Sequence, residues 1–191
     1  AYQYGGRQAF GSKFRIIDDD GNELPKDGVA QGHLLVRGPT VASGYMKQDG
    51  LTGATGVVGG WLHTGDVALL HANGYVELAD RSKDVIKSGG EWISSVELEN
   101  AAMGHPEIAE AAVIAVEHPK WQERPLLIAV RMPDSQITDQ QILDYLREKV
   151  ASWWLPDAVE FLDELPHTGT GKIYKLKLRE AFADYKLTGD G

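Results

Sequence analysis

Residues 80–100, DRSKDVIKSGGEWISSVELEN, divide the chain into two parts with different sequence patterns. Before this stretch, residues 12–81 alternate short apolar runs with turns, and the pairs Asn73-Gly74 and Asp20-Gly21 are typical of hairpins. After it, helical spacing and apolar runs alternate. We therefore expect an all-β part over residues 1–82 and a compact domain with both helices and strands over residues 84–191.

The second part contains clear helix signals. Ser94 and Glu97 have the spacing of a capping box, and the helix that they open should end at Gly104. Thr138 and Gln141 form a second such pair, before apolar residues that keep helical spacing as far as residue 153. The expected fold class is α+β. Strands are expected over 110–118, 124–132 and 158–165, and a closing helix over 175–187.

The composition limits the classes of function. The 191 residues carry a formal charge of −9 and gather Lys and Arg in no long run, which argues against a nucleic-acid or anionic-membrane surface. The lack of cysteine excludes disulfide scaffolds and thiol nucleophiles, and it suits a cytoplasmic location. No apolar run reaches the length of a transmembrane segment. The opening AYQYGGRQAFG has the character of a loop inside a protein, so we expect a fragment of a longer chain.

The six histidines show no ligand spacing that would hold a metal, so we expect no metal site made of protein ligands. His105 and His118 each precede a proline, and we expect both in loops.

Lys172 lies behind two glycines in the stretch LPHTGTGK, residues 165–172. A Walker loop requires a glycine five residues before the Gly-Lys pair and Ser or Thr directly after it. Those positions hold Pro166 and Ile173, so this stretch is not a Walker phosphate loop.

Several other polar or aromatic residues have a structural explanation as well as a functional one. Asp66, in GWLHTGD, is of a residue type common in turns. Arg81, Lys83 and Lys87 could form a solvated charged face. Trp121, between two expected strands, could serve packing alone.

The order of the motifs is more specific than any one of them. GWLHTGD at 60–66, DRSKDVIKSGGEWISSVELE at 80–99 and LPHTGTGK at 165–172 resemble the adenylate-forming superfamily of acyl-CoA synthetases, luciferases and peptide-synthetase adenylation domains. Residues 6–45 look like that family's small β subdomain, a distorted barrel. The sequence KSGGEW, followed by GHP and HPKWQERP, is most similar to that of medium- and long-chain fatty-acyl-CoA ligases.

The resemblance implies a role for each motif. Such enzymes join a carboxylic acid to the α-phosphate of ATP and then pass the acyl group to coenzyme A. Lys172 matches the catalytic lysine, which contacts the nucleotide, and Asp66 matches the acid that accepts hydrogen bonds from the ribose hydroxyls. Arg81 matches an arginine that holds the nucleotide sugar, and Lys83 matches the hinge about which the C-terminal domain turns between the two steps.

The glycine-containing loop is the candidate coenzyme A site implied by the resemblance. Ser88, Gly89 and Gly90 would line the channel for the pantetheine arm, since glycine lets backbone approach a narrow ligand closely. Trp121 could stack on the adenine of coenzyme A.

The family's phosphate loop and its Tyr-Gly-x-Thr-Glu motif are absent, so the Mg²⁺ ligands are expected in a missing N-terminal domain of the same chain. The expected partners are that domain and three small molecules: a carboxylic acid, ATP and coenzyme A. By itself the chain is expected to be inactive. Two alternatives stay open, a parent enzyme that activates an aryl or amino acid and a non-catalytic module that binds a nucleotide or a partner.

Overall fold

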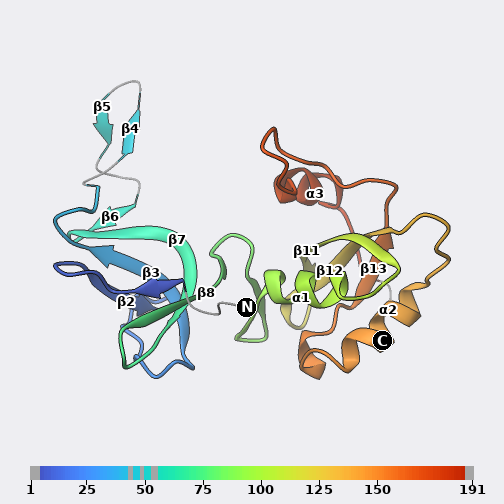
Figure 1. The fold of residues 1–191 in the computed structure, drawn as a ribbon, viewed down its shortest axis with the longest axis horizontal. Helices are drawn as coiled ribbons and strands as arrows, with labels where there is room; N and C mark the ends of the chain where they lie inside the picture. Colours follow the sequence, from blue (N-terminus) through green and yellow to red (C-terminus); the bar gives the residue numbers. More distant parts are fainter. Residues whose placement is uncertain (1–4, 43–44, 48–49, 53–55, 188–191) are drawn as a thin grey trace. The chain divides into compact units, whose positions relative to one another are not determined.

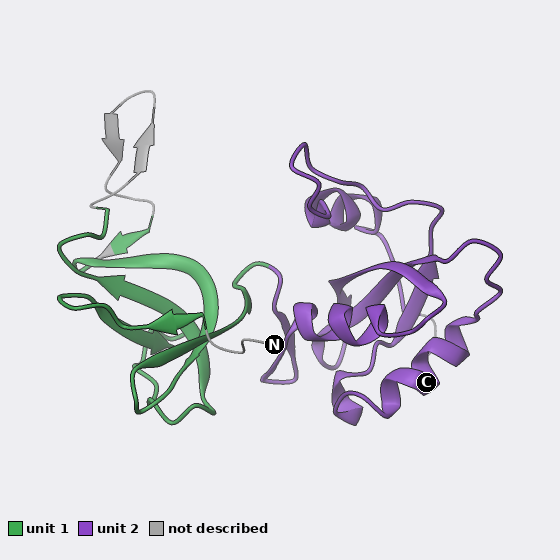
Figure 2. Ribbon diagram, in the orientation of Figure 1, with its two compact units in different colours: residues 1–83 green, residues 84–191 purple. Residues whose placement is uncertain are grey.

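The computed structural model describes residues 5–42, 45–47, 50–52 and 56–187. These residues belong to two compact units, residues 1–83 and residues 84–191 (Figures 1 and 2). Residues 1–4, from the expected opening loop, and residues 43–44, from the expected β subdomain, lie outside the described residues. Within that opening, Gly6–Arg7 forms a short strand instead of loop.

The first unit is built on a curved antiparallel sheet with the strand order β1-β8-β7-β3-β2, and β6 pairs with β7 (Figure 1). Among the described residues no pairing joins β1 to β2, so the expected distorted barrel is an open half-barrel. A separate hairpin pairs β4 with β5. The bounds are β1 Gly6–Arg7, β2 Lys13–Ile17, β3 Gln31–Arg37, β4 Tyr45–Lys47, β5 Gly50–Thr52, β6 Val57–Val58, β7 Trp61–Leu70 and β8 Tyr75–Arg81.

Both turns expected in this unit are confirmed. Asn73-Gly74 turns β7 into β8, with Gly74 at φ +84°, a conformation that glycine adopts without strain. Asp20-Gly21 lies in a turn whose two ends, Ile17 and Glu23, pair in an antiparallel β-bridge. The core of the unit includes Ile16, Leu34, Ala68, Leu70 and Val76.

The second unit contains a mixed sheet with helices on both faces, which confirms the α+β class. Its central strand β12 pairs antiparallel with β11, antiparallel with β9 at one end and parallel with β13, while β10 pairs with β9. The bounds are β9 Ile86–Ser88, β10 Glu91–Ile93, α1 Ser95–Met103, β11 Ile108–His118, β12 Gln122–Arg131, α2 Asp139–Arg147, η1 Ser152–Trp154, β13 Ala158–Phe161 and α3 Lys175–Ala181.

The helix starts expected from the sequence are confirmed. Ser94 caps α1 by accepting the N–H of Glu97, and Thr138 and Gln141 form a complete capping box on α2. The closing helix is shorter than expected, because α3 ends at Ala181 and the following apolar residues, Phe182 among them, pack against the sheet instead of continuing the helix. The strand expected over 158–165 ends at Phe161.

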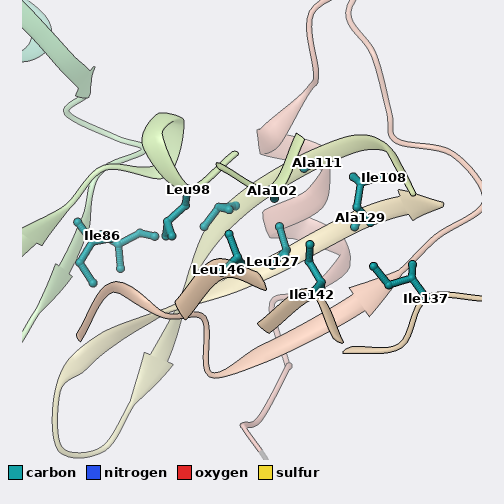
Figure 3. Packing of buried hydrophobic residues seen from close by; sticks show 12 residues of the cluster. Ile86, Leu98, Ala102, Ile108, Ala111, Leu127, Ala129, Ile137, Ile142 and Leu146 are labelled. Atoms are coloured by element: carbon teal, nitrogen blue, oxygen red, sulfur yellow. The ribbon is translucent and has the colours of Figure 1, made fainter. Parts of the chain in front are cut away.

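Alternate residues of β11 and β12 enter two separate cores, because successive side chains of a strand point to opposite faces. On one face Leu127 packs with Leu98 of α1 and with Ile142 and Leu146 of α2 (Figure 3). Val113 belongs to the same cluster. The opposite face packs against Leu178 of α3 and includes Ala112, Ile114, Leu126 and Ile128. Burial on both faces explains why these strands read as nearly continuous apolar runs.

Candidate functional site

In the first unit, Asp66 and Arg81 lie opposite each other on neighbouring strands β7 and β8. Arg81 Nη1 and Asp66 Oδ1 form an ion pair at 2.7 Å, with side chains 61% and 21% exposed. Asp66 lies inside β7, after Gly65 at φ +77°, so the alternative of a turn aspartate is wrong. The sheet register therefore places one partly buried carboxylate beside one solvent-facing guanidinium, a pair able to bind hydroxyl groups and anions.

Lys83 is the last residue of the first unit, in an exposed turn directly after β8. The next residue, Asp84, belongs to the second unit and forms an ion pair with Arg179 of α3. The chain on the second-unit side of Lys83 is thus held by α3.

In the second unit, Lys172 lies in a tight hairpin-like loop. The Thr168 amide donates to the Lys172 carbonyl at 2.7 Å, and the Gly171 amide donates to the Thr168 carbonyl at 2.9 Å. Gly171 is at φ +79°, which a side chain there would disfavour. The Lys172 side chain is exposed, so the loop presents an ammonium group to solvent.

Side-chain contacts to carboxylates hold this loop on both sides. Before it, His167 Nε2 lies 3.1 Å from Glu110 Oε1 on β11. After it, the ammonium of Lys175, at the start of α3, lies 2.6 Å from Glu99 Oε1 and donates to Ser95 Oγ at 2.7 Å. The Lys175 and Glu99 side chains are only 14% and 17% exposed. The base of the Lys172 loop is therefore firmly attached to α1 and β11.

The glycine-containing loop is a two-residue hairpin turn between β9 and β10, in which Ser88 pairs with Glu91. Gly89 and Gly90 have φ +59° and +88°, the positive values that a type I′ turn requires at both central positions. Ser88 is buried, with 7% of its surface exposed.

Trp121 packs directly against this hairpin, which we call the glycine hairpin, residues 88–91. The Trp121 carbonyl accepts a hydrogen bond from the Gly89 N–H at 2.8 Å. A Cβ atom added to Gly89 would lie 2.7 Å from Trp121 Cε3, so the indole ring occupies the place of a side chain. The Trp121 ring is also 4.5 Å from the Lys120 ammonium, and 41% of the residue is exposed. The structure therefore brings together the four residues expected at the coenzyme A site.

Two residues near the glycine hairpin were not recognised in the sequence. Arg124 donates to Ser88 Oγ, to the carbonyls of Trp153 and Leu155, and to Asp157, and its side chain is 12% exposed. An arginine directly before the apolar run 125–130 is the signal that could have marked it, because a charge that is buried with such a run requires partners.

His118 is the second missed residue. The sequence predicts His118 both as the end of the strand over 110–118 and, before a proline, as a loop residue; it ends β11 and is 7% exposed. Its Nδ1 accepts the amides of Lys120 and Trp121, each at 3.1 Å. These two hydrogen bonds give the backbone amides of the turn an acceptor in place of a neighbouring strand.

Burial and a neighbouring carboxylate raise the pKa of one ionisable group, Tyr185, which follows α3 in the chain. Burial, together with the hydrogen bond that Tyr185 donates to Glu160 at 2.8 Å, raises the pKa of Tyr185 to about 12. Within the described ranges, no group of three or more His, Cys, Asp or Glu side chains is arranged to hold a metal ion. In the same ranges no helix is both long and apolar enough to cross a membrane.

Comparison with known proteins gives consistent results. Residues 97–172 match the AMP-binding enzyme C-terminal domain. The chain is 53% identical to a 3-methylmercaptopropionyl-CoA ligase of Ruegeria lacuscaerulensis, over 96% of this chain and 33% of that protein. It is 50% identical to a medium-chain-fatty-acid–CoA ligase of Ectopseudomonas oleovorans, over 95% of this chain and 33% of that protein. The chain thus spans about a third of the length of these relatives.

Solved structures lead to the same family. The ATP-bound crystal structure of MatB from Rhodopseudomonas palustris matches 96% of this chain and 37% of its own, with a TM-score of 0.81 and 32% identity. o-Succinylbenzoate CoA synthetase from Bacillus subtilis, in complex with its acyl-adenylate intermediate, matches 93% of this chain and 35% of its own, with a TM-score of 0.79 and 30% identity. The chain therefore belongs to the adenylate-forming superfamily, and residues 97–172 correspond to the C-terminal domain of its AMP-binding enzymes.

Proposed function

We propose that the chain is the C-terminal part of an ATP-dependent fatty-acid–CoA ligase, which forms an acyl-adenylate and then an acyl-CoA thioester. The observation that carries the proposal is the match of residues 97–172 to the AMP-binding C-terminal domain, together with about 50% identity to CoA ligases. In this proposal residues 1–82 complete the larger AMP-binding domain, residues 84–191 form the mobile domain, and Lys83 is the hinge. The protein would be cytoplasmic.

The pair of Asp66 and Arg81 would hold the nucleotide. A carboxylate has acceptor capacity for two hydroxyl groups, which suits the vicinal hydroxyls of ribose. Its ion pair with Arg81, at 2.7 Å, orients the carboxylate. The exposed guanidinium can also contact the nucleotide sugar region. This arrangement supports the role assigned to both residues.

Lys172 would act in adenylate formation. The attacking carboxylate and the α-phosphate of ATP are both anionic, so an ammonium placed between them lowers the barrier, by about 3–4 kcal/mol for one good contact. The exposed position of Lys172 on a braced hairpin-like loop supports this role. Mg²⁺ would neutralise further phosphate charge, and its ligands are expected in the N-terminal domain.

Rotation about Lys83 would then exchange the Lys172 loop for the glycine hairpin. Ser88, Gly89 and Gly90 would line the pantetheine channel in the second step, because both glycines present backbone without a side chain. The packing of the Trp121 ring on Gly89 favours a supporting role for this residue over stacking on adenine.

The identities bear on which acid is activated. The chain is 50% identical to a medium-chain and 46% identical to a long-chain fatty-acid–CoA ligase, against 43% for a trans-cinnamate and 41% for a benzoate CoA ligase. We therefore place fatty acids before aryl acids. A second candidate is 3-methylmercaptopropionate, because the ligase named for that acyl group is 53% identical.

The test is pyrophosphate release by the full-length protein with ATP, Mg²⁺ and a panel of fatty acids, 3-methylmercaptopropionate, aryl acids and amino acids. We expect turnover with fatty acids or 3-methylmercaptopropionate, and no turnover by the 191-residue chain alone.

Lys172→Ala should abolish adenylation but spare thioester formation from synthetic acyl-adenylate. Lys177→Ala, on the same segment, is the matched control and should preserve both steps. Equal losses in the two steps for Lys172→Ala would refute the assigned role.

A further inference from the structure

The turn between β11 and β12 is held by one imidazole ring. His118 Nδ1 accepts the N–H of Lys120 and the N–H of Trp121, each at 3.1 Å. Only 7% of His118 is exposed, so water has little access to replace these two bonds.

This turn requires support because its backbone is strained. Gln122 has φ +70°, in the left-handed region that residues with a Cβ atom seldom adopt. Without an acceptor at residue 118, the two amides of the turn lose their partner, and less of the structure holds Gln122 at its positive φ. Such a change would displace Trp121, which directly precedes the strained residue.

The same turn determines the position of the glycine hairpin. The Trp121 carbonyl accepts the Gly89 N–H at 2.8 Å, and its ring lies where a Gly89 side chain would be. In the sheet, Gln122 pairs with Ser88. His118 therefore reaches the glycine hairpin through two consecutive residues, Trp121 of the turn and Gln122 at the start of β12, without lying in the hairpin itself.

We infer that His118 is a positioning residue for thioester formation, which holds the glycine hairpin in place through Trp121. The inference rests on the proposed function, since it assumes that coenzyme A uses this hairpin. Arg124 supports Ser88 from another direction, by a 3.0 Å hydrogen bond to its Oγ, so the hairpin is held from two sides. Adenylate formation, which uses Lys172, does not depend on this hairpin and should be spared when His118 is changed.

Two variants of His118 separate the acceptor from the rest of the side chain. Asn Oδ1 lies the same number of bonds from Cα as His Nδ1, and asparagine accepts local backbone amides in turns. His118→Asn should therefore keep both bonds, whereas His118→Leu removes the acceptor at similar size. If His118→Leu does not fold, His118→Gln replaces it, because its longer side chain places the acceptor elsewhere.

The first measurement is amide hydrogen exchange at Gly89, by NMR on the 191-residue chain, which needs no enzymatic activity. We expect exchange about tenfold faster in His118→Leu, the equivalent of one net hydrogen bond, and close to wild type in His118→Asn. Unchanged exchange in His118→Leu would show that His118 does not hold the hairpin, whatever the protein catalyses.

The second measurement separates the two half-reactions in the full-length protein. His118→Leu should raise the KM for coenzyme A about tenfold and leave pyrophosphate release within twofold, and His118→Asn should restore the KM. Equal losses in both steps, or no recovery with Asn, would reduce His118 to a general structural role and overturn the inference. If the wild-type protein forms no acyl-adenylate with any acid, the proposed function fails, and the exchange data still report on the geometry.

Discussion

Replacing Arg124 by Met should strongly destabilise the second unit. The guanidinium makes hydrogen bonds to Asp157 at 2.6 and 2.8 Å, and to the carbonyls of Trp153 and Leu155 at 2.9 and 2.8 Å. Methionine keeps the apolar stem but leaves these acceptors without their donor. Breaking a buried ion pair on one side costs about 3–5 kcal/mol. Because Asp157 is 29% exposed and can be partly hydrated, we expect the lower end, about 3 kcal/mol.

Urea denaturation of the chain, followed by tryptophan fluorescence, measures this loss. The signal reports mainly on the second unit, since four of the five tryptophans lie in it. Arg147→Met is the matched control, because Arg147 pairs with Asp144 on the surface of α2 and both side chains are 55% exposed. It should cost less than about 0.5 kcal/mol. A loss below about 1 kcal/mol for Arg124→Met, or one equal to the control, would refute the reasoning.

Three further perturbations have distinct expected results. Asp66→Asn should change the free energy of unfolding by less than about 1 kcal/mol, because the ion-pair partner of Asp66 is 61% exposed. The same variant should raise the KM for ATP in the full-length protein. A large loss of stability with unchanged kinetics would contradict this. Gly89→Ala should destabilise more than Gly90→Ala in urea, since both positions have positive φ but only the first meets an indole ring, at 2.7 Å; equal losses would argue against that contact. Burial and Glu160 raise the pKa of Tyr185 to about 12. The stabilising contribution of Tyr185 should therefore be complete below about pH 10 and disappear as the pH rises to about 12. Tyr185→Phe should remove this part of the pH dependence of the urea midpoint.

The sequence by itself determined the features that depend on near neighbours. The caps of α1 and α2 are hydrogen bonds between residues three positions apart, so Ser94 and Thr138 could be recognised from residue type and spacing. The turn at Asn73-Gly74 depends on the φ preferences of those two residues. The order of the motifs was enough to indicate the adenylate-forming superfamily, which the comparisons confirm.

Spacing was less informative where apolar residues continue past the end of an element. The closing helix was expected to reach residue 187, but it ends at Ala181, because Phe182 and the apolar residues after it gain more from packing on the sheet than from further helical turns. The roles assigned to Asp66, Arg81, Lys83 and Lys172 remain predictions, and the kinetic tests above address Asp66 and Lys172.

Only the tertiary structure decided which distant side chains meet. The Asp66–Arg81 pair depends on the register of β7 against β8, which a shift of one residue would break. Arg124 joins Ser88, 36 residues earlier, to Asp157, 33 residues later. His118 could not be interpreted from its neighbours, because its role depends on where the β11–β12 turn meets the glycine hairpin. Such contacts form between segments that are brought together by the sheet and its two cores, so no local pattern in the sequence records them.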